Sequence, residues 1–304
     1  MEPGSFYVAF APLQGYTDCV YRKAHSEVAG GVTEYYTPFV RIEGGELRRK
    51  DLRDIDKARN EGVPTVPQVI AHDGDEFARL CDVVETAGWR RIDLNMGCPF
   101  PMQVKSGRGS GLLAHEELVA AMGEEMRRRK EVRFSVKMRL GQEDASECMR
   151  LLPVLDEMPL EHVVLHPRLG KQQYKGEPDR EAFERFMAEC HHPVVYNGDL
   201  LTMADVEGVM ARWPKLKGVM LGRGLLARPW LMGGGEPQVV VGEMHRRIYD
   251  YACSVLQGDS QILARLHAFW EYQTPLLDKK QYKAIMKSGS LRNYRAAIAA
   301  LGWC

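Results

Sequence analysis

The residues of this chain best suited to chemistry lie between positions 93 and 113, where a single thiol occupies a predicted loop. A short apolar strand at 91–94 leads into Asn95, and Cys98 follows three residues later. No cation adjoins Cys98 in the sequence, so we expect the thiol to keep its proton at neutral pH, because nearby positive charge is what lowers a thiol pKa. The glycine-rich stretch at 105–111 is typical of a flexible lid. The segment therefore predicts a thiol that donates a proton rather than one that attacks as a nucleophile.

Further polar residues stand where other predicted strands end. In a barrel of parallel strands the active site lies at the carboxyl ends of the strands, so polar side chains at these points are candidates for binding or catalysis. The candidates, in chain order, are Pro12-Leu13-Gln14, Gln68, Asn95, Cys98, Lys137, Arg139, His166, Arg168, Asn197-Gly198-Asp199 and Gly222-Arg223-Gly224. Each cluster alone could be a turn, but their occurrence in phase with successive strands favours one shared site.

The elements that must position these residues alternate between strand and helix. Short apolar or β-branched runs occur at 6–10, 34–38, 65–70, 91–94, 133–138, 162–166, 193–196 and 218–221. Segments of helical periodicity follow at 73–87, 115–130, 144–157, 179–189 and 202–212, while 41–59 is predicted to be an exposed excursion on the second strand–helix loop. Eight strand–helix units in about 230 residues predict a closed (β/α)8 TIM barrel rather than an open sheet.

The clusters after the seventh and eighth predicted strands suggest a phosphate site. Loops at these two positions of a barrel commonly bind phosphate through backbone N–H groups and the N-terminus of a following helix. Gly198 and Gly222 allow the backbone to approach closely, and Arg223 supplies a cation. Lys137 and His166 would then lie nearer the middle of the mouth.

The sequence changes character near residue 235, where a Gly-Gly-Gly-Glu-Pro cluster at 233–237 predicts a linker. Beyond it, helical patterns occupy 242–257, 260–272, 279–287 and 291–301. We therefore expect a barrel domain over residues 1–235 and a small all-α domain over residues 236–304. The second domain holds nine Lys or Arg against six Asp or Glu, a small excess that suits an RNA contact or a solvated helical face.

The composition is that of an ordinary globular protein, with 45% hydrophobic and 27% charged residues. The 41 basic and 41 acidic residues cancel, so the total charge does not by itself indicate a nucleic-acid partner. The seven cysteines are scattered, and those at 19, 81, 148, 190 and 253 are expected to be small buried hydrophobic residues. Because a signal-peptide pattern and a long apolar run are both lacking, the sequence predicts a cytoplasmic protein with no membrane partner, and no metal is expected.

Several of these motifs resemble those of one enzyme family, the FMN-dependent tRNA-dihydrouridine synthases. The matching runs are Ala-Pro-Leu-Gln-Gly-Tyr-Thr-Asp at 11–18, Pro-Gln-Val at 67–69, Asn-Met-Gly-Cys-Pro at 95–99, Val-Lys-Met-Arg at 136–139, Asn-Gly-Asp at 197–199, Met-Leu-Gly-Arg-Gly at 220–224 and Pro-Trp at 229–230. They occur in the family's order and at similar spacing. The resemblance covers the whole barrel and, more loosely, the helical tail. It implies that the protein reduces the C5–C6 double bond of specific uridines in tRNA, giving 5,6-dihydrouridine.

The resemblance also assigns a role to each candidate residue. It implies tightly bound FMN, with contacts from Pro12, Leu13, Gln14, Gln68, Lys137, His166, Asn197, Gly198, Asp199, Gly222 and Arg223. Reduced FMN would give a hydride to uracil C6, Cys98 would give a proton to C5, and NADPH would be the electron donor that reduces the flavin again. Asn95, Arg139 and Arg168 would bind the substrate, Asn95 by a donor and acceptor pair at the pyrimidine edge. The helical domain would bind tRNA, and no obligate protein partner is evident.

Two of these assignments have a physical reason in the residue type. At two positions the sequence differs from that of the family. A cation such as Lys137 beside the flavin N1–C2=O edge would stabilise the reduced ring, and Gln68 offers a donor and an acceptor to the flavin's uracil-like edge. Leu13 replaces the usual Met, a mild change at a position that acts through its backbone and apolar contact. Leu169 replaces the usual Thr after the sixth strand, which removes a hydroxyl and any substrate contact it makes.

Two alternatives stay open at this point. A flavin barrel that reduces a free pyrimidine or another small enone would use the same mouth, although a small substrate has no need of basic C-terminal helices. A catalytically silent RNA-binding protein would explain those helices, although it has no need of Cys98, Lys137 and His166. The sequence favours the tRNA-modifying enzyme.

Overall fold

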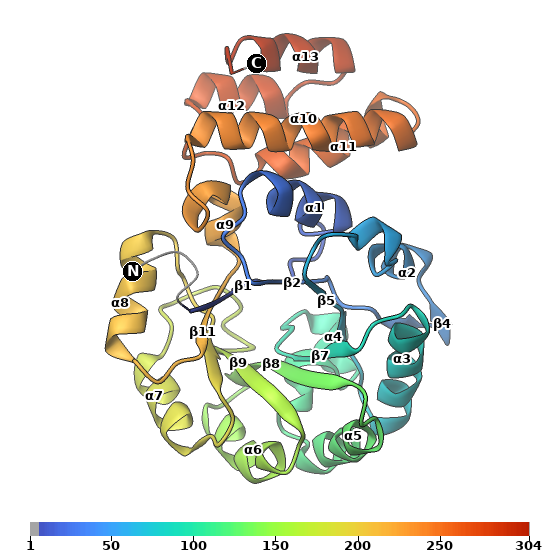
Figure 1. The fold of residues 1–304 in the computed structure, drawn as a ribbon, viewed down its shortest axis with the longest axis vertical. Coiled ribbons are helices and arrows are strands. Elements are labelled where there is room, and N and C mark those ends of the chain that lie inside the picture. The colour runs from blue at the N-terminus through green and yellow to red at the C-terminus, as the bar shows by residue number, and fades with distance from the viewer. Residues whose placement is uncertain (1–5, 304) are drawn as a thin grey trace.

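Nine parallel strands form one sheet at the centre of the molecule, and helices cover its outer face (Figure 1). The computed structural model describes residues 6–303. The strands are β1 (Tyr7–Phe10), β2 (Glu34–Tyr36), β5 (Thr65–Val66), β6 (Gln68–Val69), β7 (Arg91–Met96), β8 (Arg133–Gly141), β9 (Leu160–Leu169), β10 (Val194–Tyr196) and β11 (Gly218–Leu221). Their order, β5-β2-β1-β11-β10-β9-β8-β7-β6, confirms the predicted (β/α)8 barrel.

The barrel closes at its third strand, which a proline divides in two. The predicted strand at 65–70 forms as β5 and β6 on either side of Pro67, because proline has no N–H to contribute to a strand ladder. β5 pairs with β2, whereas β6 pairs with β7. The Asp93 N–H donates to the Pro67 carbonyl at 2.9 Å, and Val40 bridges Val69. The ring is therefore continuous across the break.

The helices that follow the strands each bury one face against the barrel. They are α1 (Cys19–Val28), α3 (Gly74–Thr86), α5 (Glu116–Arg128), α6 (Ser146–Asp156), α7 (Arg180–Glu189) and α8 (Met203–Arg212). In α3, Phe77, Leu80, Cys81 and Val84 are buried at helical spacing. The Asp73 carboxylate caps its first turn by accepting a backbone N–H. These spacings and caps are what made the helices predictable.

Buried apolar side chains fill part of the interior of the barrel. Ala9, Val66, Val164, Val195 and Met220 belong to one buried cluster, since alternate residues of a strand point to the same face. The neighbouring strand positions join the larger cluster beneath the helices. The space above the interior cluster is left to the polar residues at the strand ends.

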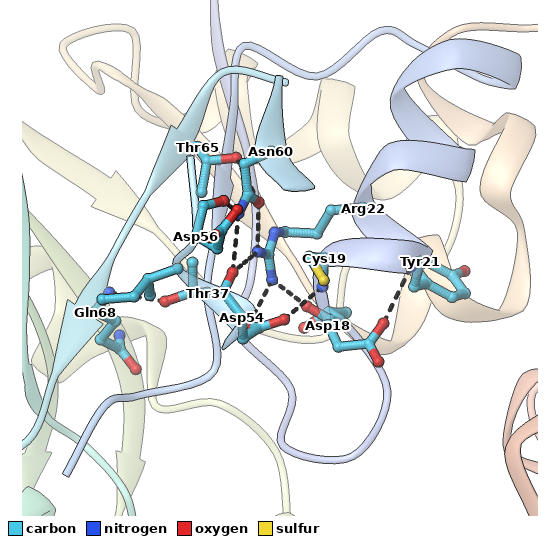
Figure 2. Close-up of polar contacts among 12 residues, drawn as sticks. Asp18, Cys19, Tyr21, Arg22, Thr37, Asp54, Asp56, Asn60, Thr65 and Gln68 are labelled. Carbon is cyan, nitrogen blue, oxygen red and sulfur yellow. Dashed lines mark hydrogen bonds and ion pairs between the residues drawn. The ribbon is translucent and has the colours of Figure 1, made fainter. Parts of the chain in front are cut away.

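The segment 41–59, predicted to be exposed, is partly buried. It forms a hairpin of β3 (Ile42–Glu43) and β4 (Glu46–Leu47), the helix α2 (Arg49–Asp54) and the start of a 3-10 turn, η1 (Ala58–Asn60). Arg22 of α1 is 1% exposed and donates to the Asp54 carboxylate at 3.0 Å (Figure 2). It also donates to the Asn60 side-chain oxygen at 2.7 Å. The predicted exposure is wrong around Asp54, because the buried Arg22 side chain needs polar partners and this segment provides them.

Four helices complete the chain and stack beyond α1 at one end of the molecule (Figure 1). They are α10 (Pro237–Val255), α11 (Asp259–Trp270), α12 (Lys279–Met286) and α13 (Leu291–Ala299). This confirms the predicted helical tail, but α10 begins at Pro237 instead of residue 242. Proline suits the first turn of a helix, where no N–H donor is needed. The division into two domains at residue 235 stays a prediction.

The helical tail contacts the loop that follows β1. Arg265 of α11 forms an ion pair with Asp18, and the Tyr16 hydroxyl donates to the Glu271 carboxylate at 2.9 Å. The rings of Tyr16 and Tyr272 meet edge to face with 5.1 Å between their centroids. The loop that carries the first group of candidate residues is therefore held from the side of the tail.

Of the cysteines predicted to be buried, Cys19, Cys81 and Cys148 are buried and Cys190 is half-buried. Cys253 is exposed, so the prediction is wrong there, because its position in α10 faces away from the packed side. Cys304 lies outside the described residues. None of the helices within residues 6–303 is both long and apolar enough to span a membrane.

Candidate active site

A cavity of about 390 Å³ opens at the carboxyl ends of the barrel strands, a size usual for cofactor and small-molecule sites. The predicted residues that line it are Pro12, Leu13, Gln14, Asn95, Cys98, Lys137, Arg139, His166, Asn197, Gly198, Asp199, Gly222 and Arg223. Gln68 and Arg168 are buried and stand outside this lining. The structure thus brings together most of the residues that the strand ends predicted.

Asn95 holds the Cys98 loop through its side-chain oxygen, which accepts the backbone N–H groups of Gly97 at 3.1 Å and Cys98 at 2.9 Å. Its amide nitrogen donates to Gln68 Oε1 at 2.7 Å. Gln68 Nε2 in turn donates to the Asp93 carboxylate at 2.7 Å. The Asn95 oxygen faces two backbone N–H groups, so the Asn95 nitrogen faces Gln68 Oε1, and this leaves Gln68 Nε2 to donate to Asp93. This series of hydrogen bonds, the Asp93 chain, runs from the barrel interior to the thiol loop.

The Asp93 chain changes what Asn95 can offer to a ligand. Its side-chain oxygen already accepts two hydrogen bonds, so the predicted donor and acceptor pair toward a pyrimidine is not available. One amide N–H remains. Asp93 was not among the predicted site residues, although a carboxylate inside an apolar strand indicates a buried polar partner.

The glycine-rich segment after Cys98 is folded against it. It contains α4 (Pro101–Lys105) and the 3-10 turn η2 (Gly109–Leu112). The backbone N–H and the hydroxyl of Ser110 both donate to the Cys98 carbonyl at 3.0 Å. A Cβ atom at Gly109 would lie 2.5 Å from that same carbonyl oxygen. Only glycine lets the chain pass so close, and movement of this segment as a lid stays a prediction.

Burial raises the pKa of the half-buried Cys98 thiol. A backbone hydrogen bond and the positive charges of Arg139, Lys137 and Arg41 oppose this shift without cancelling it. The thiol is therefore protonated at neutral pH. The same positive charges would stabilise the thiolate that forms when the proton is transferred.

Lys137 and Asp93 have displaced pKa values in the middle of the barrel. Burial, assisted by the charge of Arg139, lowers the pKa of Lys137 to about 8. Burial raises the pKa of Asp93 to about 7, although hydrogen bonds from Ser135 and Gln68 act in the opposite direction. A desolvated ammonium in the cavity wall suits a ligand that carries or develops negative charge.

The Arg139 guanidinium joins the thiol loop to the loop after β9. It donates to the carbonyl oxygens of Gly97 at 3.0 Å, Leu169 at 2.9 Å and Gln173 at 2.7 Å. It also lies 5.6 Å from the centroid of the Tyr174 ring. Leu169, where the family's hydroxyl is missing, therefore contributes its carbonyl to the loop contact. The predicted role of Arg139 in substrate binding is not tested by these contacts.

Arg168 supports the cavity wall from behind. It forms an ion pair with Asp199 and donates to the Gly176 carbonyl and to His166 Nε2, the latter at 3.2 Å. Since arginine only donates, Nε2 of His166 accepts and Nδ1 carries the proton. Burial and the surrounding arginine and lysine charges hold the pKa of His166 well below its usual range. Arg168 thus orients a neutral histidine, and its predicted contact with substrate stays untested.

The end of the cavity predicted to bind phosphate contains Gly198, Gly222 and Arg223. Asn197 Nδ2 donates to the Met220 carbonyl at 2.7 Å and ties the loop after β10 to strand β11. Arg223, the first residue of α9 (Arg223–Ala227), donates to the Asp199 carboxylate at 2.7 Å. The backbone glycines and the cation are in place, and phosphate binding there stays a prediction.

Sequence reasoning missed the aromatic part of the cavity wall. Phe39, Phe100, Tyr174 and Tyr272 line the cavity. The centroid of the Tyr174 ring lies 4.6 Å from the Arg223 guanidinium carbon. These rings come from loops, where no periodic pattern marks a residue as facing a cavity. Tyr272 follows α11, so the helical tail contributes to the mouth of the barrel.

A closed barrel with its cavity at the carboxyl ends of the strands, a protonated thiol and a row of cations defines the class of (β/α)8-barrel enzymes. Within that class, the chain belongs to the dihydrouridine synthase (Dus) family, whose model matches residues 9–301. This confirms the resemblance found in the sequence motifs.

Named relatives share most of their length with this chain. It is 32% identical to "tRNA-dihydrouridine(16) synthase" of Ralstonia nicotianae over 232 residues, covering 73% of this chain and 70% of the relative. It is 30% identical to the protein of the same name from Neisseria meningitidis serogroup B, covering 73% and 68%. A "Probable tRNA-dihydrouridine synthase" of Rhizobium leguminosarum bv. phaseoli is 25% identical and covers 96% and 93%.

Solved structures share the fold. Histamine dehydrogenase from Rhizobium sp. 4-9 matches with a TM-score of 0.55 and 12% identity, covering 79% of this chain and 48% of that chain. Morphinone reductase matches with a TM-score of 0.51 and 11% identity, covering 76% and 87%. Both confirm the barrel architecture alone.

Proposed function

We propose that this protein reduces the C5–C6 double bond of uridines in tRNA to 5,6-dihydrouridine. The observation that carries the proposal is the protonated Cys98 thiol at a cationic barrel mouth in a chain of the dihydrouridine synthase family. The names of its relatives support tRNA as the substrate. A tRNA substrate is consistent with a cytoplasmic location.

FMN is the proposed cofactor, and the residues present suit it. The cavity has the size of a cofactor site, Lys137 offers a desolvated cation to a ring that gains negative charge, and Gly198, Gly222 and Arg223 offer a phosphate-binding end. Pro12, Leu13 and Gln14 line the wall after β1. When bound and reduced by NADPH, FMN supplies a hydride to uracil C6.

The protein's own part in the reaction is to hold and deliver a proton. The Cys98 thiol gives its proton to uracil C5, and the charges of Arg139 and Lys137 stabilise the thiolate that is left. Asn95 keeps the thiol loop in position through two hydrogen bonds. Its remaining N–H is the group we propose for the substrate carbonyl.

The helical tail is the proposed tRNA-binding part. Lys283, Lys287, Arg292 and Arg295 are exposed on α12 and α13, and such exposed cations bind phosphate backbones by releasing counterions. A barrel acting on a free pyrimidine or small enone would gain nothing from them. The tRNA substrate is therefore the better account of the whole chain.

Purified protein incubated with FMN, NADPH and unmodified tRNA tests the proposal. We expect the protein to bind FMN and to form dihydrouridine, detected by mass spectrometry of the digested tRNA. Uridine-containing tRNA that stays unchanged while a free pyrimidine or enone is reduced would favour the small-substrate alternative. Protein that binds tRNA but takes up no FMN would favour the silent RNA-binding alternative.

A further inference from the structure

The rim of the cavity carries an aromatic side chain that contributes nothing to the core. Phe100 is 69% exposed and lines the cavity two residues after Cys98. It belongs to neither hydrophobic cluster of the described residues and is not among the side chains packed against them. An exposed large apolar group beside a cavity marks a place for binding. Folding of residues 6–303 gives no reason for it.

Pro101 restricts the backbone of Phe100, and Pro99 restricts the backbone just before it. Pro99 and Pro101 flank it, and each proline fixes its own φ and restricts the residue before it to extended angles. Phe100 itself has φ −66° and ψ 127°. Because this backbone is already fixed, a ligand that contacts the ring loses little affinity to the ordering of the loop.

The charge around the ring suits a polyanion. Lys137, Arg139 and Arg223 line the same cavity, and the carboxylate of Asp199 there is already paired with Arg168 and Arg223. Exposed aromatic rings beside cations are the means by which proteins bind unpaired nucleotides, because the ring stacks on a base and the cations contact phosphates.

We propose that Phe100 stacks on the nucleobase next to the uridine that enters the cavity. This inference rests on the proposed function. A uridine that leaves its stack to reach the barrel exposes the face of its neighbour, and the ring at the rim covers that face. Phe100 is then a substrate-binding residue that sets which nucleotides beside the target are accepted.

The first test compares Phe100→Ala with wild type and with Phe100→Tyr, which keeps the ring. The matched control is Met102→Ala, since Met102 is 67% exposed on the short helix α4 that follows Phe100 but lines a separate hollow with Arg79. We expect Phe100→Ala to lower kcat/KM for tRNA about 5- to 150-fold, the range found when a base loses an aromatic partner. Phe100→Tyr and Met102→Ala should remain within twofold of wild type. Equal rates for Phe100→Ala and wild type overturn the inference.

Synthetic tRNA identifies the base that the ring contacts. Two transcripts carry an abasic residue on the 5′ or the 3′ side of the uridine that wild-type protein reduces. If Phe100 stacks on one of these bases, the transcript that lacks that base is reduced more slowly by wild type. The same transcript causes no further loss of rate in Phe100→Ala. A constant ratio of wild type to Phe100→Ala across the intact tRNA and both abasic transcripts means that the ring contacts neither neighbour, which contradicts the inference.

The two half-reactions separate this inference from other outcomes. Reduction of the bound flavin by NADPH needs no RNA, so Phe100→Ala should leave its rate unchanged. Slowing of that step by the same factor would place the nicotinamide dinucleotide against the ring and overturn stacking on tRNA. Wild-type protein that forms no dihydrouridine would contradict the proposed function itself, and this is seen before any variant is compared.

Discussion

The pKa of the Cys98 thiol is set by two opposing influences, burial and the positive charges beside it. Burial raises the pKa, while Arg139 and Lys137 oppose the rise. Such a thiol is protonated in the resting protein, and the thiolate formed after proton transfer is stabilised by the neighbouring cations. The thiol differs in this way from nucleophilic cysteines, whose pKa values are lowered so that the thiolate is the resting form.

Replacement of Cys98 by alanine should separate proton donation from flavin binding. We expect Cys98→Ala to bind FMN normally and to reduce tRNA about 10²- to 10⁴-fold more slowly, the usual contribution of a positioned acid. Cys190→Ala, which removes a half-buried thiol outside the cavity, is the control and should be fully active. Single-turnover oxidation of the reduced flavin by tRNA measures both. A wild-type rate for Cys98→Ala would refute the proton-donor role.

The pH dependence of the same step follows from the direction of the thiol's pKa shift. Because the pKa is raised above its ordinary value of 9.0, the protonated form prevails through neutral pH and is lost only at more alkaline pH. We expect the single-turnover rate in wild type to be flat between pH 6 and about pH 7 and to fall near pH 8, where Lys137, with a pKa of about 8, loses its charge. It should fall further at more alkaline pH as the thiol loses its proton. A rate that rises between pH 7 and 9 would indicate a thiolate mechanism instead.

Asp93 should make the stability of the fold depend on pH. Its folded pKa, about 7, is above the ordinary 3.8, so the folded state binds the proton more tightly, and stability falls as pH rises from 4 to 7. Asp93→Asn keeps an oxygen for Gln68 and removes this titration. Denaturant unfolding should therefore show Asp93→Asn gaining stability relative to wild type between pH 5 and pH 8. A constant difference across that range would contradict the raised pKa.

At the scale of elements, periodic patterns predicted the barrel and its helices but not the contacts between loops. The spacing of Phe77, Leu80 and Val84 marks α3 without any knowledge of its neighbours. Burial of Asp54, by contrast, depends on Arg22 from a different helix, and that pairing has no signature in the sequence near either residue. In the candidate site, too, features set by local sequence patterns were predictable and contacts between distant segments were not.

Residues that end strands were predictable as site residues, whereas those that act from loops or from behind the wall were not. Lys137 and His166 follow from strand position alone, since parallel strands bring their carboxyl ends together. Phe100 and Tyr272 come from loops, and the tertiary fold alone brings them to the cavity. Arg168 was placed at the correct strand end, but its guanidinium pairs with Asp199 rather than lining the cavity.

Two glycines, Gly107 before the turn η2 and Gly109 at its first position, give a matched pair of substitutions. Gly107 and Gly109 both have positive φ, 71° and 59°, so alanine at either position strains the backbone and costs about 1 kcal/mol. Only at Gly109 would the added Cβ meet the Cys98 carbonyl, at 2.5 Å, whereas at Gly107 the nearest atom is 3.7 Å away. We expect thermal unfolding to show destabilisation in both variants, but Gly109→Ala alone to slow tRNA reduction, by at least tenfold. Equal activities would mean that the thiol position tolerates the shift.

At the scale of the whole molecule, the balanced charge conceals a local excess on the helical tail. Replacing Lys283, Lys287, Arg292 and Arg295 by alanine should weaken tRNA binding and reduce the slope of log Kd against log salt. Flavin binding should be unaffected, because none of these four residues lines the cavity. Filter binding at several salt concentrations measures the slope.

The control for that experiment removes the same charge elsewhere. Arg128, Lys130, Arg212 and Lys215 are exposed at the ends of α5 and α8, near the starts of the next strands and thus on the opposite side of the barrel from the cavity. Their replacement by alanine should leave the affinity and its salt slope close to wild type. If both sets weaken binding equally, the RNA-binding surface is not confined to the tail.

The break at Pro67 in the third strand leaves β5 and β6 as a weakly paired part of the barrel, which we call the seam. Pro67 has no amide hydrogen, so β5 and β6 are held to their neighbours by fewer ladder bonds than the long pair β8 and β9. Local opening should begin there, and amide hydrogens of Thr65 and Val66 should exchange faster than those of β8. Gln68 sits on this seam, so each opening would also release the amide that steadies the thiol loop. A ligand that fills the cavity should therefore slow amide hydrogen exchange at the seam relative to the free protein.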